Sequence, residues 1–132
     1  MEFNESEIMK VVAAEENAGG FPALIQKFKK LGIIKYDFLV ESGVYVFSDL
    51  NTTITLPLNG TPHVVSATAS KENLRAAVKK AQSGLIDFGQ FCKLSGEAGI
   101  LNWRAELDKM EVTYFDREGN IMLKEPIPVV TD

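Results

Sequence analysis

The chain has 132 residues, a net charge of −4 at pH 7, and apolar and charged shares of 45% and 24%. This length corresponds to about one domain, and the composition is that of an ordinary soluble globular protein. No apolar run approaches the roughly 20 residues of a membrane helix, which argues against a membrane protein. The negative charge argues against nucleic acid as a partner, because phosphate binding draws on clustered Lys and Arg.

The N-terminus and the cysteine content indicate the compartment. The first ten residues are acidic and lack an apolar run with a small-residue cleavage site, so a secretory signal is not expected. The single cysteine, Cys92, cannot form an intramolecular disulfide, which fits a reducing compartment. We therefore expect a cytoplasmic protein that forms a single domain over residues 1–132.

Two helices are predicted at the start of the chain. Asn4 followed by Glu7 resembles a capping box, and Gly19-Gly20 ends an acidic N-terminal helix within residues 1–20. Pro22 is tolerated in the first turn of a second helix. The apolar residues of this second helix recur at the spacing i, i+3, i+4, i+7: Phe21, Leu24, Ile25, Phe28 and Leu31.

Charge is distributed unevenly over these two helices. Residues 1–20 hold five Glu and one Lys, whereas residues 21–35 hold four Lys and no acid. Two interpretations remain open. In the first, the charges lie on the solvated faces of two neighbouring helices that attract each other, because charge runs are usually solvated surface. In the second, the lysines form a basic patch for an anionic ligand.

A change of period after the second helix indicates strands. Over residues 34–40 apolar residues alternate with others, and residues 41–43 have the composition of a turn. Residues 44–47 are apolar throughout, which leaves the hairpin loop open between two and three residues. Residues 52–56 form a third strand by their β-branched content, and residues 63–67 are a candidate fourth.

Two further helices are predicted between the strands. Ser70 caps one that ends at Gly84, and Asp87 with Gln90 opens another that is closed by Gly99. The last of these helices is expected to be short, because each Gly in a helix interior costs about 1 kcal/mol relative to Ala.

Residues 100–125 have the clearest pattern in the chain. Residues 101–107 alternate between apolar and polar, which indicates a half-buried strand. A two-residue connection at Asp108-Lys109 places Trp103 opposite Tyr114, and a one-residue slip would destroy the common apolar face.

A second turn, at residues 116–119, continues this meander. It places Tyr114 opposite Ile121 and keeps the apolar residues of three strands on one face. Residues 126–132 form an edge or a tail, because their two prolines cannot donate to a sheet ladder.

The predicted order is two helices, three or four strands, two helices and three strands. Runs of strands separated by runs of helices indicate an α+β domain rather than a parallel, doubly wound sheet. The simplest architecture is a single antiparallel sheet made of two hairpin or meander units. About four helices cover its apolar face.

Several motifs follow one another in a distinctive order along the chain: FPALI (21–25), LGI (31–33), Tyr36, AGI (98–100), Trp103, MEVTYFDREGN (110–120) and EPIP (125–128). In these motifs and their order the chain resembles a known family, the YbcV-like proteins. The resemblance covers nearly the whole chain from Phe21 to Pro128 and departs from the family between residues 52 and 68. The family comprises small bacterial and prophage-borne proteins of unknown function, some labelled "phage envelope protein". The resemblance implies a single compact α+β domain and brings no activity or catalytic residues.

Few residues could support catalysis. Cys92 and His63 are the only cysteine and histidine, so a nucleophilic Cys–His pair is arithmetically possible. Cys92 follows Phe88 by four residues on the face expected to be buried, where cysteine behaves as a small apolar group. One His and one Cys also leave a zinc site short of ligands. We therefore predict no catalytic residues, no metal and no cofactor.

The aromatic residues of the sheet offer another possibility. Trp103 and Tyr114 are expected to form an aromatic pair in the core. If the helices cover the sheet incompletely, this pair would line a pocket for a small apolar or aromatic ligand, together with Tyr36 and Phe38. The candidate ligand-binding residues are then Trp103, Tyr114, Tyr36 and His63.

Two functions are compatible with these patterns. The leading hypothesis is a non-enzymatic, cytoplasmic protein-interaction module that binds an unknown protein partner, or a second copy as a homodimer, through an exposed strand edge. The alternative is a small-molecule-binding protein or weak hydrolase with a pocket beside Trp103 and Tyr114. Neither hypothesis involves nucleic acid or a membrane.

Overall fold

The computed structural model describes residues 6, 8–10, 21–49, 51–57 and 61–127. Residues 8–10 are helical and Ile8 is fully buried, whereas the predicted ends of this first helix, Asn4 and Gly19-Gly20, lie outside the described residues. The elements that follow are α2 (Phe21–Lys30), β1 (Lys35–Leu39), β2 (Val44–Ser48), β3 (Thr53–Leu56), α3 (Lys71–Gln82), α4 (Phe88–Glu97), β4 (Ile100–Glu106), β5 (Glu111–Asp116) and β6 (Ile121–Pro126). None of the described helices is both long enough and apolar enough to cross a membrane.

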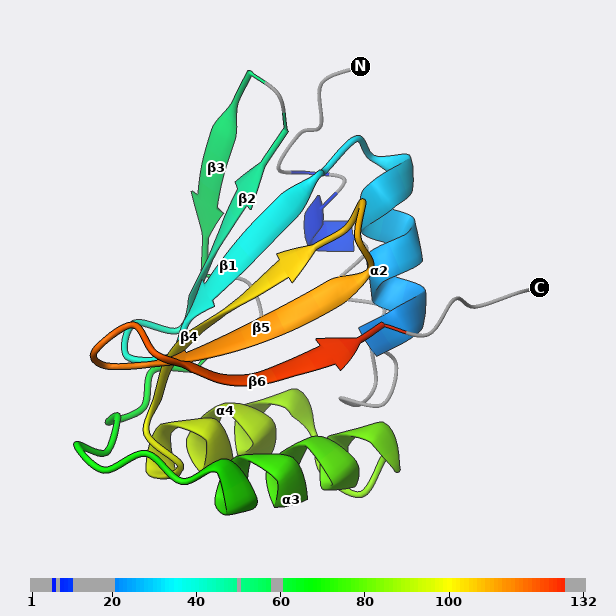
Figure 1. The fold of residues 1–132 in the computed structure, drawn as a ribbon. Coiled ribbons are helices and arrows are strands. Elements are labelled where there is room, and N and C mark those ends of the chain that lie inside the picture. The colour runs from blue at the N-terminus through cyan, green and yellow to red at the C-terminus, as the bar shows by residue number, and fades with distance from the viewer. Residues whose placement is uncertain (1–5, 7, 11–20, 50, 58–60, 128–132) are drawn as a thin grey trace.

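The six strands form one antiparallel sheet in the order β3-β2-β1-β4-β5-β6 (Figure 1). Two units of three consecutive strands meet in its middle, where β1 pairs with β4 and Phe38 lies opposite Trp103. This arrangement confirms the predicted α+β fold with a single antiparallel sheet built from two hairpin or meander units.

Two local predictions in the first half of the chain are wrong. Residues 63–67 do not form a strand: the His63 N–H donates to the Val40 carbonyl and the Ser66 N–H to the Gly96 carbonyl, and the segment joins no ladder. The loop between β1 and β2 contains four residues instead of two or three. It closes through a hydrogen bond of 2.8 Å from the Gly43 N–H to the Leu39 carbonyl.

The registers of the meander show one prediction confirmed and one wrong. Trp103 pairs with Tyr114, as the two-residue connection predicted. In the next hairpin Tyr114 pairs with Leu123 rather than with Ile121, a shift of two residues. Side chains alternate between the faces of a strand, so this even shift leaves Leu123 on its predicted face. Ile121 was predicted on the same face but pairs with Phe115 on the opposite face, and this residue is 52% exposed.

Two features of this hairpin produce the shift. The turn is one residue longer than predicted, because the Asp116 N–H donates to the Asn120 carbonyl and Gly119, at φ +83°, completes a three-residue loop. A β-bulge between Tyr114 and Phe115 adds the second residue.

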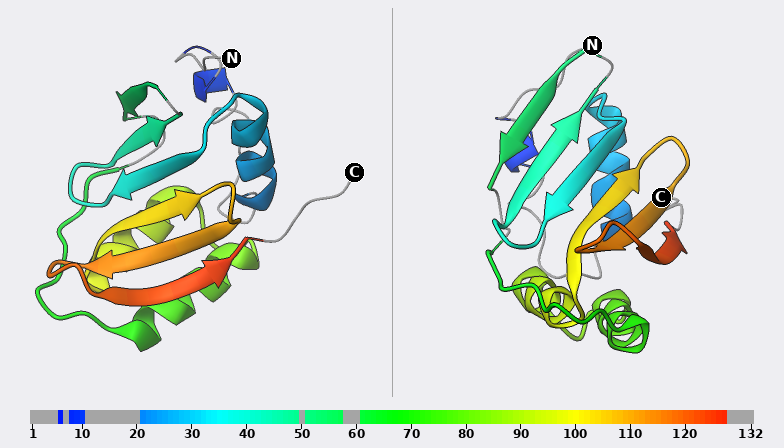
Figure 2. Two further views of the ribbon diagram at one scale, coloured as in Figure 1. Left: turned by 45° about the horizontal axis from the view of Figure 1, so that its top comes forward. Right: turned by 60° about the vertical axis from the view of Figure 1, so that its left-hand side comes forward.

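Aromatic rings pack on one face of the sheet. Phe28 of α2 meets Tyr36 and Phe47 edge-on, with ring centroids 5.6 and 5.1 Å apart. Phe88 of α4 meets Phe38 in the same way at 5.2 Å. The helices α2 and α4 therefore cover the same face, and α3 packs against α4 and β6, away from α2 (Figure 2).

The segment 61–70 crosses α4 and the residues after it so closely that two glycines are required. A Cβ atom on Gly96 would lie 2.6 Å from the Val64 carbonyl oxygen, and one on Gly99 would lie 2.6 Å from the Ala69 Cα. Backbone hydrogen bonds of 2.8 and 2.9 Å hold the segment against this part of the chain. Packing therefore explains Gly96, which the helix interior alone would disfavour, and it adds a second reason for glycine at Gly99, where the positive φ already favours it.

We expect Gly99→Ala to lower the free energy of unfolding by several kcal/mol. A left-handed backbone at φ +82° costs an L-residue about 1–2 kcal/mol, and overpacking against Ala69 adds about 1–3 kcal/mol. Gly119→Ala is the matched control, because its φ is +83° and nothing lies within 4 Å of the added Cβ. Urea unfolding followed by tryptophan fluorescence measures both losses, and equal losses would contradict the close crossing.

Candidate functional site

Three of the four predicted ligand-binding residues lie together inside the core. The exposed fractions of Tyr36, Trp103 and Tyr114 are 2%, 3% and 6%. The Trp103 and Tyr114 ring centroids are 5.8 Å apart, and the Trp103 side chain hydrogen-bonds to Tyr36. Burial raises the pKa of both tyrosines above the usual value of 10.0, so both remain neutral phenols at physiological pH.

Helix α4 occupies the space over Trp103. The indole stacks on Phe38 with ring centroids 4.6 Å apart and contacts Phe91 at 5.2 Å and Phe88 at 6.1 Å. Each such pair contributes about 0.5–1.5 kcal/mol beyond the burial of its area. Trp103 therefore joins the two halves of the sheet to α4 as part of a packed cluster.

His63, the fourth predicted residue, makes different contacts. Its Nε2 lies 2.8 Å from the Thr61 Oγ1, and its backbone N–H donates to the Val40 carbonyl. Cys92 is fully buried and also hydrogen-bonds with Thr61. Thr61 thus connects the single histidine and the single cysteine of the chain.

Burial keeps the Cys92 thiol protonated. Desolvation raises the pKa of Cys92 to about 12, and the hydrogen bonds with Thr61 offset only part of that effect. The thiolate, not the thiol, is the nucleophile of cysteine chemistry. This arrangement therefore leaves Cys92 in its unreactive form at physiological pH.

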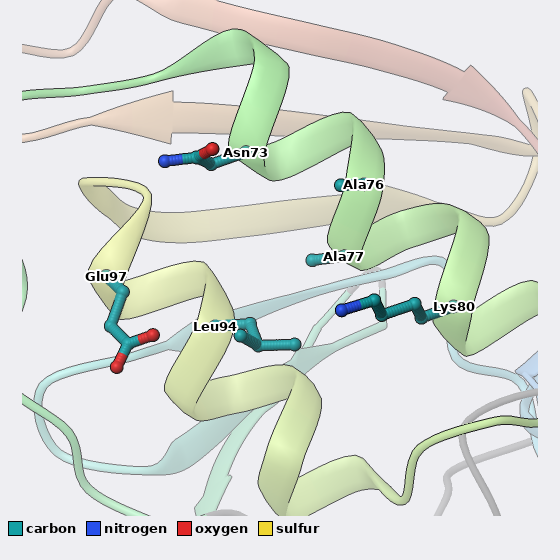
Figure 3. Close-up of a pocket in the computed structure, with 6 residues that line it drawn as sticks. All are labelled: Asn73, Ala76, Ala77, Lys80, Leu94 and Glu97. Carbon is teal, nitrogen blue, oxygen red and sulfur yellow. The ribbon is translucent and has the colours of Figure 1, made fainter.

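A shallow depression of about 160 Å³ lies between α3 and α4. Lys80 of α3 and Leu94 of α4 point toward each other across it (Figure 3). Small-molecule pockets usually enclose about 300–1,000 Å³, so this depression is small for such a ligand. In the part of the chain that the structure describes, no group of three or more His, Cys, Asp or Glu residues is placed to hold a metal ion.

The opposite face of the sheet is polar where its two halves meet. Arg104 donates to the Asp37 carboxylate through Nε at 2.9 Å and Nη2 at 3.2 Å, and Asn102 donates to the same carboxylate at 3.4 Å. The Arg104 guanidinium also lies 5.4 Å from the centroid of the Phe115 ring. The side chains of Arg104 and Asp37 are 42% and 22% exposed, so their ion pair contributes at most about 1 kcal/mol. The pair links β1 and β4 on this face, in addition to their backbone ladder.

The two edges of the sheet are β6 and β3, and β6 is protected against pairing. The Ile127 N–H donates to the Met110 carbonyl at 2.8 Å. Alternate residues of an antiparallel ladder bond inward, so the backbone groups of Pro126 and Lys124 face outward. Pro126 has no N–H to offer, and Lys124 places an exposed charge on the edge. Both features oppose the addition of another strand.

The other edge, β3, lacks these protections. The Asp49 N–H donates to the Thr52 carbonyl at 3.0 Å, so the backbone of Thr52 faces β2. Alternate residues of an antiparallel ladder face the same neighbour, so the backbone of Ile54 also bonds to β2. The backbone N–H and C=O groups of Thr53 and Thr55 therefore point away from β2. Both threonine side chains are exposed and the strand contains no charge. No described residue pairs with this outer side, and Figure 1 shows β3 at the margin of the sheet.

Sequence patterns identified residues 52–56 as a strand but not as an edge. The available signal was an uncharged, β-branched run that ends at Pro57, a residue that cannot donate to a ladder. Whether such a run lies at an edge depends on the strand order, which side-chain alternation does not specify. The exposed groups of Thr53 and Thr55 therefore became visible only with the assembled sheet.

Together these observations define a small α+β domain with a packed aromatic core and, among the residues that the structure describes, one unprotected sheet edge. The chain belongs to the family described as protein of unknown function DUF1398, whose model matches residues 9–126. No curated protein matches the chain.

Cys92 is the only thiol in the chain, so its reactivity tests the buried environment directly. Because burial raises its pKa from 9.0 to about 12, we expect the folded protein at pH 8 to react with a disulfide reagent at least about a hundredfold more slowly than the urea-unfolded protein. The absorbance of the released thiolate measures both rates. Equal rates in the two states would show that Cys92 is an accessible thiol.

Proposed function

We propose that this protein is a non-enzymatic interaction domain that takes up an extended strand from a partner along the outer side of β3. The observation that carries this proposal is the outward direction of the backbone groups of Thr53 and Thr55 on an uncharged edge. Strand addition is a common mode of peptide recognition, in which main-chain hydrogen bonds provide the affinity.

The contrast between the two edges supports this assignment. A proline and a charged residue protect β6, whereas β3 presents N–H and C=O groups beside exposed threonines. Unprotected edges are a hazard for aggregation, and proteins usually block them unless they are used. The burial of Cys92, which opposes thiolate formation, further favours an interaction role over catalysis through that residue.

The wider setting of this proposal rests on the sequence. The similarity to YbcV-like proteins suggests a bacterial protein with a prophage association, and the single cysteine suggests the cytoplasm. The partner is a protein rather than a nucleic acid, because the chain has a net charge of −4.

The small-molecule alternative, a binding protein or weak hydrolase with a site at Trp103, Tyr114, Tyr36 and His63, remains a prediction. The packing of α4 over Trp103 gives it less support than the β3 edge. A thermal-shift screen tests it, because a ligand that binds only the folded state raises the midpoint once its concentration exceeds Kd. Unchanged midpoints across metabolite and nucleotide libraries would remove this alternative.

Proline substitution on β3 tests the proposed function. Thr55→Pro removes an N–H that points away from β2, so the fold should persist while a strand-adding partner loses a hydrogen bond and meets the proline ring. Thr55→Ala is the matched control, because it retains the N–H. We expect peptides selected from a displayed random library to bind the wild type and Thr55→Ala, and to bind Thr55→Pro at least about tenfold more weakly.

The comparison requires that both variants remain folded, which circular dichroism and a two-state melt verify. Selected peptides that bind Thr55→Pro as tightly as Thr55→Ala would place their site elsewhere. Failure to select any peptide, combined with a chain that neither self-associates nor recovers a partner, would contradict an interaction role.

A further inference from the structure

We infer that the strand taken up by β3 is β3 of a second copy, paired antiparallel about a two-fold axis at Ile54. The inference rests on the proposed function, since it names the partner of the same edge. The two sheets would then become continuous through both copies, with each β3 changing from an edge strand to an inner strand.

The composition of β3 fits a partner identical to itself. A two-fold pair places each residue opposite a residue of the same short segment, and like charges placed opposite each other are destabilising. The segment TITL contains no charge, so self-pairing brings no repulsion. At the other edge, self-pairing of β6 would bring the exposed Lys124 toward its own copy.

The directions of the backbone groups restrict the register. Only residues whose N–H and C=O face outward can exchange hydrogen bonds, so Thr53 and Thr55 must meet outward-facing residues of the partner. An axis at Ile54 sets Thr53 opposite the partner's Thr55 on both sides of the axis. All the outward N–H and C=O groups of the two strands are then paired.

The neighbouring registers leave groups unpaired. An axis at Thr55 would set Thr53 opposite the partner's Pro57, which has no N–H. An axis at Thr53 would set Thr55 opposite the partner's Asn51, whose N–H already donates to the Asp49 carboxylate at 2.8 Å. Of these three registers, the one centred on Ile54 therefore pairs the most outward-facing backbone groups.

The same register also matches the side chains on both faces. Ile54 is partly buried against the core and would lie directly opposite the partner's Ile54, in a pair that is not hydrogen-bonded and whose Cα atoms approach to about 4.5 Å. On the other face, the exposed Thr53 and Thr55 would form cross-strand threonine pairs, which are favourable. The pairing thus covers apolar surface on one face and joins polar side chains on the other.

The short length of β3 limits the strength of this dimer. A stable interface buries about 1,200–2,000 Å² in total, more than a pair of four-residue strands provides. We therefore expect weak, reversible association between micromolar and millimolar concentrations, seen as a rise in average mass in sedimentation equilibrium. Thr55→Pro should remain a monomer over the range in which Thr55→Ala associates.

Single cysteines on β3 test the register. In a Cys92→Ala background, Ile54→Cys should form a disulfide-linked dimer under mild oxidation, because the two sulfur atoms of a directly opposite pair can reach bonding distance. Thr53→Cys alone and Thr55→Cys alone should cross-link at least about tenfold more slowly, since each lies diagonal to its own copy at about 7–8 Å. A mixture of these two variants should cross-link readily.

Each outcome bears on the inference. Faster cross-linking of Thr53→Cys alone than of Ile54→Cys would overturn the register, and a wild-type dimer in which neither cross-links would place the interface elsewhere. A strict monomer at all concentrations would overturn the second copy as partner. If Thr55→Pro still abolished peptide binding, the proposed function would survive that result. If peptides also failed to bind, the proposed function would fail with the dimer.

Discussion

The pairing of β1 with β4 is the constraint on which the rest of the structure depends. These strands come from units more than 60 residues apart, as the hydrogen bonds from Asn102 and Arg104 to Asp37 show. On the core face Phe38 stacks on Trp103 at 4.6 Å, and on the opposite face the Asp37–Arg104 pair spans the same two strands. Each half of the sheet has an apolar face of its own, and this pairing aligns the two faces so that α4 can cover the junction.

This alignment also directs the functional interpretation. Because Phe88 and Phe91 of α4 pack over Trp103, the aromatic residues contribute to the stability of the junction. Placing β1 and β4 at the centre leaves β3 and β6 at the margins. Among the described residues, Pro126 and Lys124 protect β6 and no comparable feature protects β3, and this asymmetry motivates the proposed interaction role of β3.

The sequence predicted those features that depend on local periodicity. It gave the α+β class, the two units of strands and the pairing of Trp103 with Tyr114, because alternation and a two-residue turn fix them. It missed the position of Leu123 opposite Tyr114 and of Ile121 on the opposite face, because the alternation shows neither the bulge nor the longer turn. It could not identify β3 as an edge or explain Gly96, because both depend on which distant segments meet.

Amide hydrogen exchange along β3, measured by NMR in dilute solution, tests the central claim most directly. The account predicts fast exchange at Thr53 and Thr55 and slow exchange at Ile54 and Leu56, because only the latter two donate toward β2. Exchange at the two threonines should then slow as the protein concentration rises. Strong protection of Thr53 and Thr55 at the lowest concentration would contradict the account, because it would show that the edge is already covered within a single chain.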